Sequence, residues 1–306
     1  MRMPQLLNEE NKRAWKSLPK AIGIVAGALA SIPYLYVRNK LFGGKRTTSL
    51  RDHFIMAASK TMNIKLVYNE HSAPVTNKVA IFPIKHLARM DARVIPEFPQ
   101  ADFMMTAHFF NMPVLGRVIK AAANVSGFIP TTQTSDDKKR DQGQVIQRLN
   151  DNVSVCVFPE GCCSGAEMLE WSKGSLEPLF GAAGEDTRGN TISLKNQDVV
   201  VQPVSLRVKE INGVDVLNSP DEWGKYTMIL DHRNILSRVW ARMKQQSVTV
   251  EMQVLPELNP RDFSSAEDLM NEAHNKVRQI VNPDQVGTRR RREFVEWTEA
   301  QPHRVY

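Results

Sequence analysis

The sequence predicts an α/β fold in which a central, largely parallel mixed sheet is flanked by helices and preceded by an apolar N-terminal helix. Short runs rich in β-branched and aromatic residues alternate with helical patterns from about residue 50 onward. Ahead of them, a single apolar run lies between basic residues. Strands that alternate with helices form parallel sheets, and functional side chains then gather at the carboxyl ends of those strands.

The strands are expected where short apolar runs end in turn residues, and the helices where apolar residues recur every three to four positions. The expected strands cover residues 63–68, 78–83, 102–107, 126–130, 153–159, 198–206, 226–230 and 247–255. The expected helices cover residues 113–125, 135–151 and 264–282, the second with Ser135 or Asp136 as N-cap and the third with Ser264 or Ser265. The run 198–206 carries Pro203, which is unusual because proline has no N–H to donate within a sheet.

Composition limits the class of protein. The chain has 306 residues, of which 42% are hydrophobic and 24% charged, so it can bury the core of one large domain or two small ones. Its net charge of +7 favours contact with a phospholipid surface, a phosphorylated cofactor or nucleic acid. Three closely spaced cysteines, Cys156, Cys162 and Cys163, form neither a disulfide framework nor a CxxC pair, which indicates a reducing compartment.

The apolar run AIGIVAGALASIPYLYV at residues 21–37 predicts contact with a membrane. Basic residues bracket it on both sides, with no acid between Lys12 and Arg46. The run is slightly shorter than the roughly 20 residues of a spanning helix, so a spanning anchor, an interfacial helix and a buried core helix all stay open. We expect a membrane anchor over residues 1–48, an α/β domain over 49–282 and a basic tail over 283–306.

Two loops after predicted strands carry the candidate chemistry. His86 follows the strand 78–83, and Asp91 lies five residues further on, where a helix is expected to begin. An imidazole takes a proton near neutral pH, and a carboxylate beside it fixes its tautomer and stabilises the imidazolium. The strand 153–159 leads into FPEGCCSG at 158–165, which places Glu160 at its carboxyl end.

These blocks resemble the glycerolipid acyltransferase family, typified by 1-acylglycerol-3-phosphate O-acyltransferase. The resemblance rests on HxxxxD at 86–91, FPEG at 158–161 and QPVS at 202–205, in the family's order and about seventy residues apart for the first two. Residues 111–130 and WSKGSLEP at 171–178 are similar to the family's intermediate and following blocks, so the resemblance covers residues 62–258 or so.

The resemblance implies acyl transfer from acyl-CoA or acyl-carrier protein to the hydroxyl of a lyso-lipid, with no metal and no bound cofactor. His86 would be the general base and Asp91 its orienting partner, while backbone N–H groups near a helix start or Gly161 would stabilise the oxyanion. Glu160 would bind the acceptor. Membrane phospholipids would be partners, with the acyltransferase domain on the cytoplasmic face of a bacterial inner membrane. The other implied substrate-binding residues are Phe158, Pro159, Gly161, Thr131, Cys162 and Cys163.

The chain departs from the family at its phosphate-binding positions. Two arginines that clamp phosphate in the typical lysophosphatidate enzyme are replaced, one by Thr131 or Thr132 and the other by Cys163. Lys85 stands where the family has asparagine or serine before the histidine. The branch that acylates lyso-ornithine lipid tolerates small polar residues after FPEG, so the acceptor is expected to be of the lysophosphatidate or the lyso-ornithine type. Positive charge is also available from Lys85, Arg89, Arg117 and Lys173.

Other functions remain open from the residues alone. Cys162 or Cys163, with His86 as base, is a chemically reasonable nucleophile. Metal binding by His86, Asp91 and the cysteines, or a serine hydrolase using Ser164, fits the spacing less well. A degenerate acyltransferase fold acting as a membrane scaffold or lipid-binding protein is the alternative from another class. The run TRRRREF at 288–294 lacks an aromatic stacking platform, so we expect a basic tail or a membrane contact and no nucleic acid.

Overall fold

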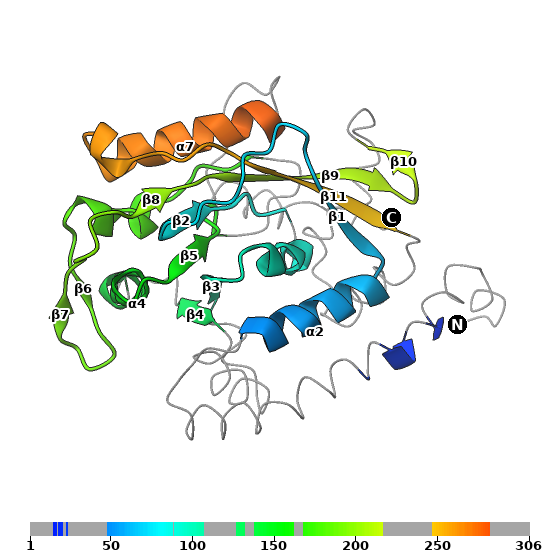
Figure 1. Cartoon of the computed structure of the whole chain (residues 1–306), viewed down its shortest axis with the longest axis horizontal. Helices are drawn as coiled ribbons and strands as arrows, with labels where there is room; N and C mark the ends of the chain where they lie inside the picture. Colours follow the sequence, from blue (N-terminus) through cyan, green and yellow to red (C-terminus); the bar gives the residue numbers. More distant parts are fainter. Residues whose placement is uncertain are drawn as a thin grey trace, which may run out of the picture.

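A parallel sheet and a mixed sheet form the centre of the molecule in the computed structural model (Figure 1). The parallel sheet has the strand order β4-β3-β5-β2-β8. Its strands are β2 (Ala80–Pro83), β3 (Ala101–Thr106), β4 (Phe128–Thr131), β5 (Ser154–Val157) and β8 (Val200–Val201). The structure describes residues 15–16, 18–20, 23, 48–87, 89–106, 127–131, 138–161, 168–216 and 247–281.

The mixed sheet has the order β1-β11-β9-β10, in which β1 and β11 are parallel and the other pairs antiparallel. A separate antiparallel ribbon joins β6 to β7. The bounds of these strands are β1 (Ile64–Tyr68), β6 (Gly184–Glu185), β7 (Thr191–Ile192), β9 (Val204–Ile211), β10 (Val214–Asp215) and β11 (Val248–Val254).

Pro203 divides the strand that was expected over residues 198–206. Residues before it pair with β2 in the parallel sheet, whereas β9 begins after it and pairs with β11 in the mixed sheet. Because proline donates no hydrogen bond, the ladder is interrupted at this point and the chain changes sheets. The two sheets stay connected through a parallel bridge between Ile84 and Val204. The expected sheet is therefore two sheets, of which the one that carries the site loops is wholly parallel.

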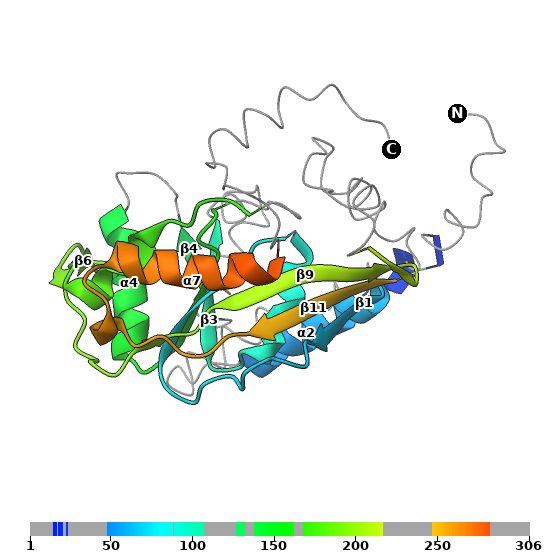
Figure 2. The same ribbon diagram turned by 90° about the horizontal axis from the view of Figure 1, so that it is seen from above.

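Within the residues that the structure describes, three α-helices cover the sheets, with α7 and α2 on opposite sides (Figures 1 and 2). Helix α2 packs against η2 and β1, α4 against β5 and β6, and α7 against β9. Ser265 caps α7, since its hydroxyl accepts from the N–H of Asp268 at 3.1 Å. The helices are α2 (Thr48–Thr61), α4 (Lys138–Asn150) and α7 (Ala266–Val281), and the 3₁₀ turns are η2 (Arg89–Glu97), η4 (Lys173–Ser175), η5 (Glu177–Phe180) and η6 (Pro260–Asp262).

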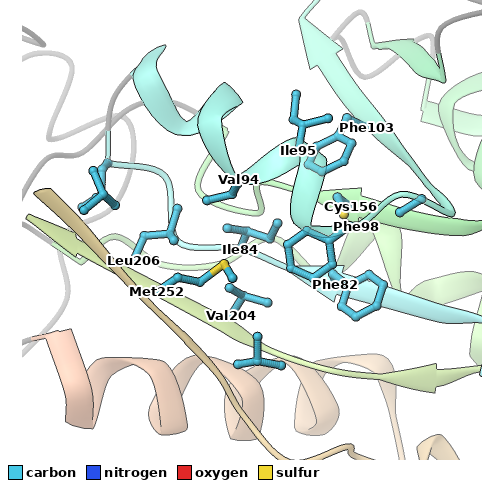
Figure 3. Packing of buried hydrophobic residues seen from close by; sticks show 14 of the residues in the cluster. Phe82, Ile84, Val94, Ile95, Phe98, Phe103, Cys156, Val204, Leu206 and Met252 are labelled. Carbon is cyan, nitrogen blue, oxygen red and sulfur yellow. The ribbon is translucent and has the colours of Figure 1, made fainter. Parts of the chain in front are cut away.

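Alternate residues of the central strands serve two hydrophobic cores. Phe82 of β2 and Cys156 of β5 belong to a core that continues through Ile84 onto β9 and β11 (Figure 3). Ile81 and Val155, one position away, belong to a second core with α4 and α7. Strands buried on both faces are typical of parallel sheets. They hold the loops at their carboxyl ends on a rigid base.

Most of the expected elements in the described residues are confirmed, within a few residues at each end. Helix α2 was not expected. The expected elements at 113–125 and 226–230, the apolar run 21–37 except Gly23, and the tail 283–306 lie outside the described residues, and the domain boundaries stay predictions. No helix within the described residues is long and apolar enough to cross a bilayer.

Candidate active site

The candidate site lies where the adjacent parallel strands β2 and β5 end. The segment after β2 carries Lys85 and His86 and leads into η2, which carries Asp91. The turn after β5 carries Phe158 to Gly161. Because β2 and β5 are parallel neighbours, both loops leave the same edge of the sheet.

His86 and Asp91 form a direct pair. Nδ1 of His86 lies 2.7 Å from Oδ2 of Asp91, and the side chains are 20% and 3% exposed, respectively. An ionised carboxylate only accepts, so Nδ1 carries the proton of this hydrogen bond and the tautomer of the imidazole is fixed. The ring of Phe158 packs against the imidazole with centroids 4.4 Å apart and planes tilted by 31°. These contacts orient the imidazole at the edge of the sheet.

Glu160 is buried among donors of the protein itself. Its Oε2 accepts from the backbone N–H of His86 at 3.1 Å, and its Oε1 accepts from the N–H of Leu169 at 3.1 Å. Nζ of Lys85 lies 3.1 Å from Oε1 and 3.2 Å from Oε2. The side chains of Lys85 and Glu160 have 0% exposure. The expectation that Glu160 binds the acceptor stays a prediction, and these contacts bind it to the loop of His86.

The FPEG turn is closed by backbone hydrogen bonds. Gly161 has a φ of 68°, a conformation that glycine adopts without steric cost. Its N–H donates to the carbonyl of Phe158 at 3.0 Å, and the N–H of Ser172 donates to the carbonyl of Pro159 at 3.0 Å. The N–H of Gly161, expected near the oxyanion, therefore closes this turn.

Helix α7 contacts the segment after the FPEG turn through His274. Nε2 of His274 lies 3.0 Å from the carbonyl oxygen of Leu169, whose N–H donates to Glu160. Burial lowers the pKa of His274, and this effect outweighs the hydrogen bond to Leu169, which raises it. A neutral imidazole donates here, with the ring of Trp171 packed edge-on at a centroid distance of 5.5 Å. The helix thus completes a chain of contacts that runs through Leu169 to Glu160.

The sequence comparison decides the family of this site. A family model described as Acyltransferase matches residues 64–207, a stretch that includes both loops. Residues 64–207 therefore carry an acyltransferase domain, in agreement with the resemblance of the HxxxxD and FPEG blocks. A search of curated protein sequences returned no match.

The fold of the acyltransferase domain is also found in a solved structure. The crystal structure of the 1-acyl-sn-glycerophosphate (LPA) acyltransferase PlsC from Thermotoga maritima matches with a TM-score of 0.54 and 17% sequence identity. The match covers 90% of this chain and 100% of that chain. At this identity, the likeness concerns the fold. It agrees with the predicted α/β architecture.

The structure brings together most of the predicted site residues of the acyltransferase domain. His86, Asp91 and the turn 158–161 meet, whereas Thr131 is buried at the end of β4, which β3 separates from β5. Cys162 and Cys163 lie outside the described residues. Cys156, at the centre of the sheet, is buried, and burial raises its pKa well above the usual range, so it is a core residue. Within the described part of the chain, no three His, Cys, Asp or Glu side chains cluster as metal ligands do.

Lys85 is the residue of the site whose role the sequence reasoning missed. From the sequence, the lysine before the histidine is a departure from the family and a possible source of charge for phosphate. The structure buries its ammonium against Glu160. The signal available in the sequence was its position, next to the histidine and at the end of a wholly apolar strand, where a solvated side chain has little room.

Proposed function

We propose that this protein is a membrane-associated O-acyltransferase that moves a fatty acyl group from acyl-CoA or acyl-carrier protein to the hydroxyl of a lyso-lipid. The observation that carries the proposal is the pair of His86 and Asp91, joined at 2.7 Å at the carboxyl edge of the parallel sheet in an acyltransferase-family domain.

The pair supports a direct transfer. Asp91 accepts from Nδ1–H, so Nε2 is the nitrogen that acts as base. Nε2 takes the proton of the acceptor hydroxyl while the oxygen attacks the thioester carbonyl. The tetrahedral intermediate then collapses, the C–S bond breaks, and the imidazolium returns the proton to the leaving thiolate. Asp91 stabilises the imidazolium between the two proton transfers. No metal or bound cofactor takes part in these steps.

The charged residues at the site bear on the class of the acceptor. The solved relative from Thermotoga maritima is named for a phosphate-bearing acceptor, which supports a lyso-phospholipid for this chain. Thr131 or Thr132 and, at the second position, Cys163 stand where the family clamps phosphate with arginine, however, and the ammonium of Lys85 is paired with Glu160. These features favour a lyso-ornithine lipid or another acceptor without a terminal phosphate. Lysophosphatidate is the second candidate.

The N-terminal sequence bears on the location of the protein. The apolar run 21–37 and its flanking basic residues favour attachment to an anionic bilayer, with the domain on the cytoplasmic face of a bacterial inner membrane. Acyl thioesters are supplied in the cytoplasm, and the lyso-lipid acceptor lies in the membrane. The anchor and the domain together place both substrates at one site.

A panel assay tests the proposal. The purified full-length chain in detergent or vesicles is incubated with labelled acyl-CoA or acyl-carrier protein and with lyso-ornithine lipid, lysophosphatidate or other lyso-lipids. We expect acyl transfer to at least one of them, and a rate lower by roughly 10²-fold or more with His86→Ala. Wild-type protein that is folded and transfers acyl groups to no acceptor would refute the enzymatic function and favour the lipid-binding scaffold. Lipid analysis of cells that lack the protein identifies the acceptor as the lyso-lipid that accumulates.

A further inference from the structure

The proposed general base and the two residues before it are fixed through their backbones. Three successive N–H groups donate to three different parts of the fold. The N–H of Ile84 donates to the carbonyl of Val157 at 2.9 Å, and that of Lys85 to the carbonyl of Val204 at 3.1 Å. The N–H of His86 donates to Oε2 of Glu160 at 3.1 Å. Only the last of these bonds depends on a side chain.

The carboxylate that holds His86 is itself held by a buried lysine. The side chains of Lys85 and Glu160 have 0% exposure and lie 3.1 Å apart at the nearest oxygen. A charge buried in this way is stable only when it is paired and hydrogen-bonded, and removing one partner leaves the other uncompensated. Lys85 thus holds the carboxylate of Glu160 in place, and Glu160 in turn fixes the backbone of His86, the residue after Lys85.

The same carboxylate connects His86 to helix α7. Its Oε1 accepts from the N–H of Leu169, and the carbonyl of Leu169 lies 3.0 Å from Nε2 of His274. A single side chain therefore links the loop after β2, the turn after β5 and the segment that contacts α7. This position suits a group that sets the geometry of a reacting residue without touching the substrate.

We propose that Lys85 and Glu160 are positioning residues that act through His86, and that Glu160 therefore serves the base rather than the acceptor. The inference rests on the proposed acyltransferase function. The inference gives Lys85 a positioning role. The ammonium of Lys85 is then not one of the groups that bind an acceptor phosphate. The expected signature is a change in kcat at nearly constant KM for the acceptor, because the pair contacts the base and not the substrate.

The test compares Lys85→Met, Glu160→Gln and the double variant of both in the full-length enzyme. Displacing a catalytic group by about 1 Å costs roughly 100-fold, so we expect kcat to fall by about that factor in each single variant with acceptor KM within about threefold of wild type. The double variant contains no uncompensated buried charge, and the glutamine introduced by Glu160→Gln retains an acceptor for the N–H of His86. We therefore expect its kcat to exceed that of Lys85→Met and to come within about tenfold of wild type.

A matched control is Arg148→Met, which breaks the 2.7 Å ion pair with Asp102 near the opposite, amino-terminal end of the sheet. It should lower the melting temperature and leave kcat and KM within about twofold of wild type, since it does not contact the site. A kcat loss in the control as large as in the single variants, at equal loss of stability, would show that the effect is only structural and overturn the proposal.

The separate effects of the variants on kcat and on KM distinguish this inference from the proposed function. A Glu160→Gln variant whose acceptor KM rises more than about tenfold while kcat stays near wild type would mean that Glu160 binds the acceptor, which overturns the inference and leaves the enzymatic function standing. Where the single variants do not fold, the double variant decides in the same way: a lower kcat at unchanged KM supports the inference, and any other result overturns it. A wild-type enzyme without turnover refutes the proposed function itself.

Discussion

Nδ1 of His86 lies 2.7 Å from Oδ2 of Asp91, although a continuous helix would turn residues five positions apart away from each other by about 140°. The two side chains meet because His86 lies in the irregular segment after β2, whereas Asp91 lies in the first turn of η2. Asp91 is 3% exposed and His86 20% exposed. The change from irregular backbone at His86 to the 3₁₀ turn that carries Asp91 therefore creates the pair.

Replacing Asp91 by asparagine should lower kcat by roughly 10²- to 10⁴-fold, the usual contribution of general base catalysis. The amide stabilises no imidazolium and no longer fixes the proton on Nδ1. Steady-state rates of acyl transfer provide the measurement. Glu97→Gln, in the same 3₁₀ helix and bonded to Tyr68 and Arg93, is the control and should retain wild-type kcat. An Asp91→Asn enzyme within about threefold of wild type would exclude the carboxylate from catalysis.

Replacing Phe158 by alanine should lower kcat about tenfold. The ring packs on the imidazole of His86 at a centroid distance of 4.4 Å, and aromatic pairs of this kind contribute about 0.5–1.5 kcal/mol beyond their buried area. Without the ring, the imidazole samples more orientations, and a smaller fraction of them is reactive. Phe158→Leu keeps most of the apolar contact, so its kcat should lie between those of wild type and Phe158→Ala. Equal kcat for all three would mean that the ring does not orient His86.

Stability should fall as the pH is lowered, in part through His274. Burial lowers the pKa of His274 in the folded protein, so in the range just below the ordinary value of about 6.5 the unfolded chain binds a proton at this residue that the folded chain does not. The stability that neutral His274 provides is complete above that range and is lost as the pH falls through it toward the folded-state pKa.

A glutamine in place of His274 tests this contribution. Its side-chain amide does not titrate and retains a donor for the carbonyl of Leu169, which His274 contacts at 3.0 Å. Thermal melting of wild type and His274→Gln at pH 7.5 and pH 5.5 gives the measurement. Between pH 7.5 and pH 5.5, the melting temperature of the variant should fall less than that of wild type. A larger acid-induced loss in the variant would contradict the assignment of a buried, neutral histidine.

Replacing Gly143 by alanine should destabilise the protein by about 1–3 kcal/mol, although alanine is ordinarily the better helix former by about 1 kcal/mol. A Cβ atom at Gly143 would lie 1.9 Å from the carbonyl oxygen of Glu185, because β6 crosses α4 at backbone contact. Denaturant unfolding measures the change. Gln147→Ala, at an exposed position of the same helix, is the control and should be neutral or slightly stabilising. A Gly143→Ala protein as stable as wild type would rule out this close approach.

The sequence predicted the reacting pair but not the supports around it. His86, Asp91 and the FPEG turn follow apolar strands, and the rule that parallel strands collect function at their carboxyl ends places them together. The partnership of Lys85 with Glu160 joins residues 75 positions apart, and lysine is almost never fully buried, so local pattern does not reveal it.

Helix α2 and the division of the strand at Pro203 could not be predicted from the local sequence pattern. The apolar residues Phe54, Ile55 and Met56 of α2 are consecutive instead of three or four positions apart, so the segment lacks the period of an amphipathic helix. Pro203 was recognised as unusual within a strand. The strand is divided between two sheets because the residues before Pro203 pair with β2 and those after it pair with β11. This pairing depends on the tertiary structure.

The initial rate of acyl transfer by His86→Ala, measured beside wild type on the best acceptor of the panel, tests the central claim most directly. With melting temperature and membrane association unchanged, we predict a loss of roughly 10²-fold or more, since the base that accepts the hydroxyl proton is gone. A folded His86→Ala enzyme that retains more than about a tenth of the wild-type rate would contradict the account, because the transfer would then proceed without the imidazole.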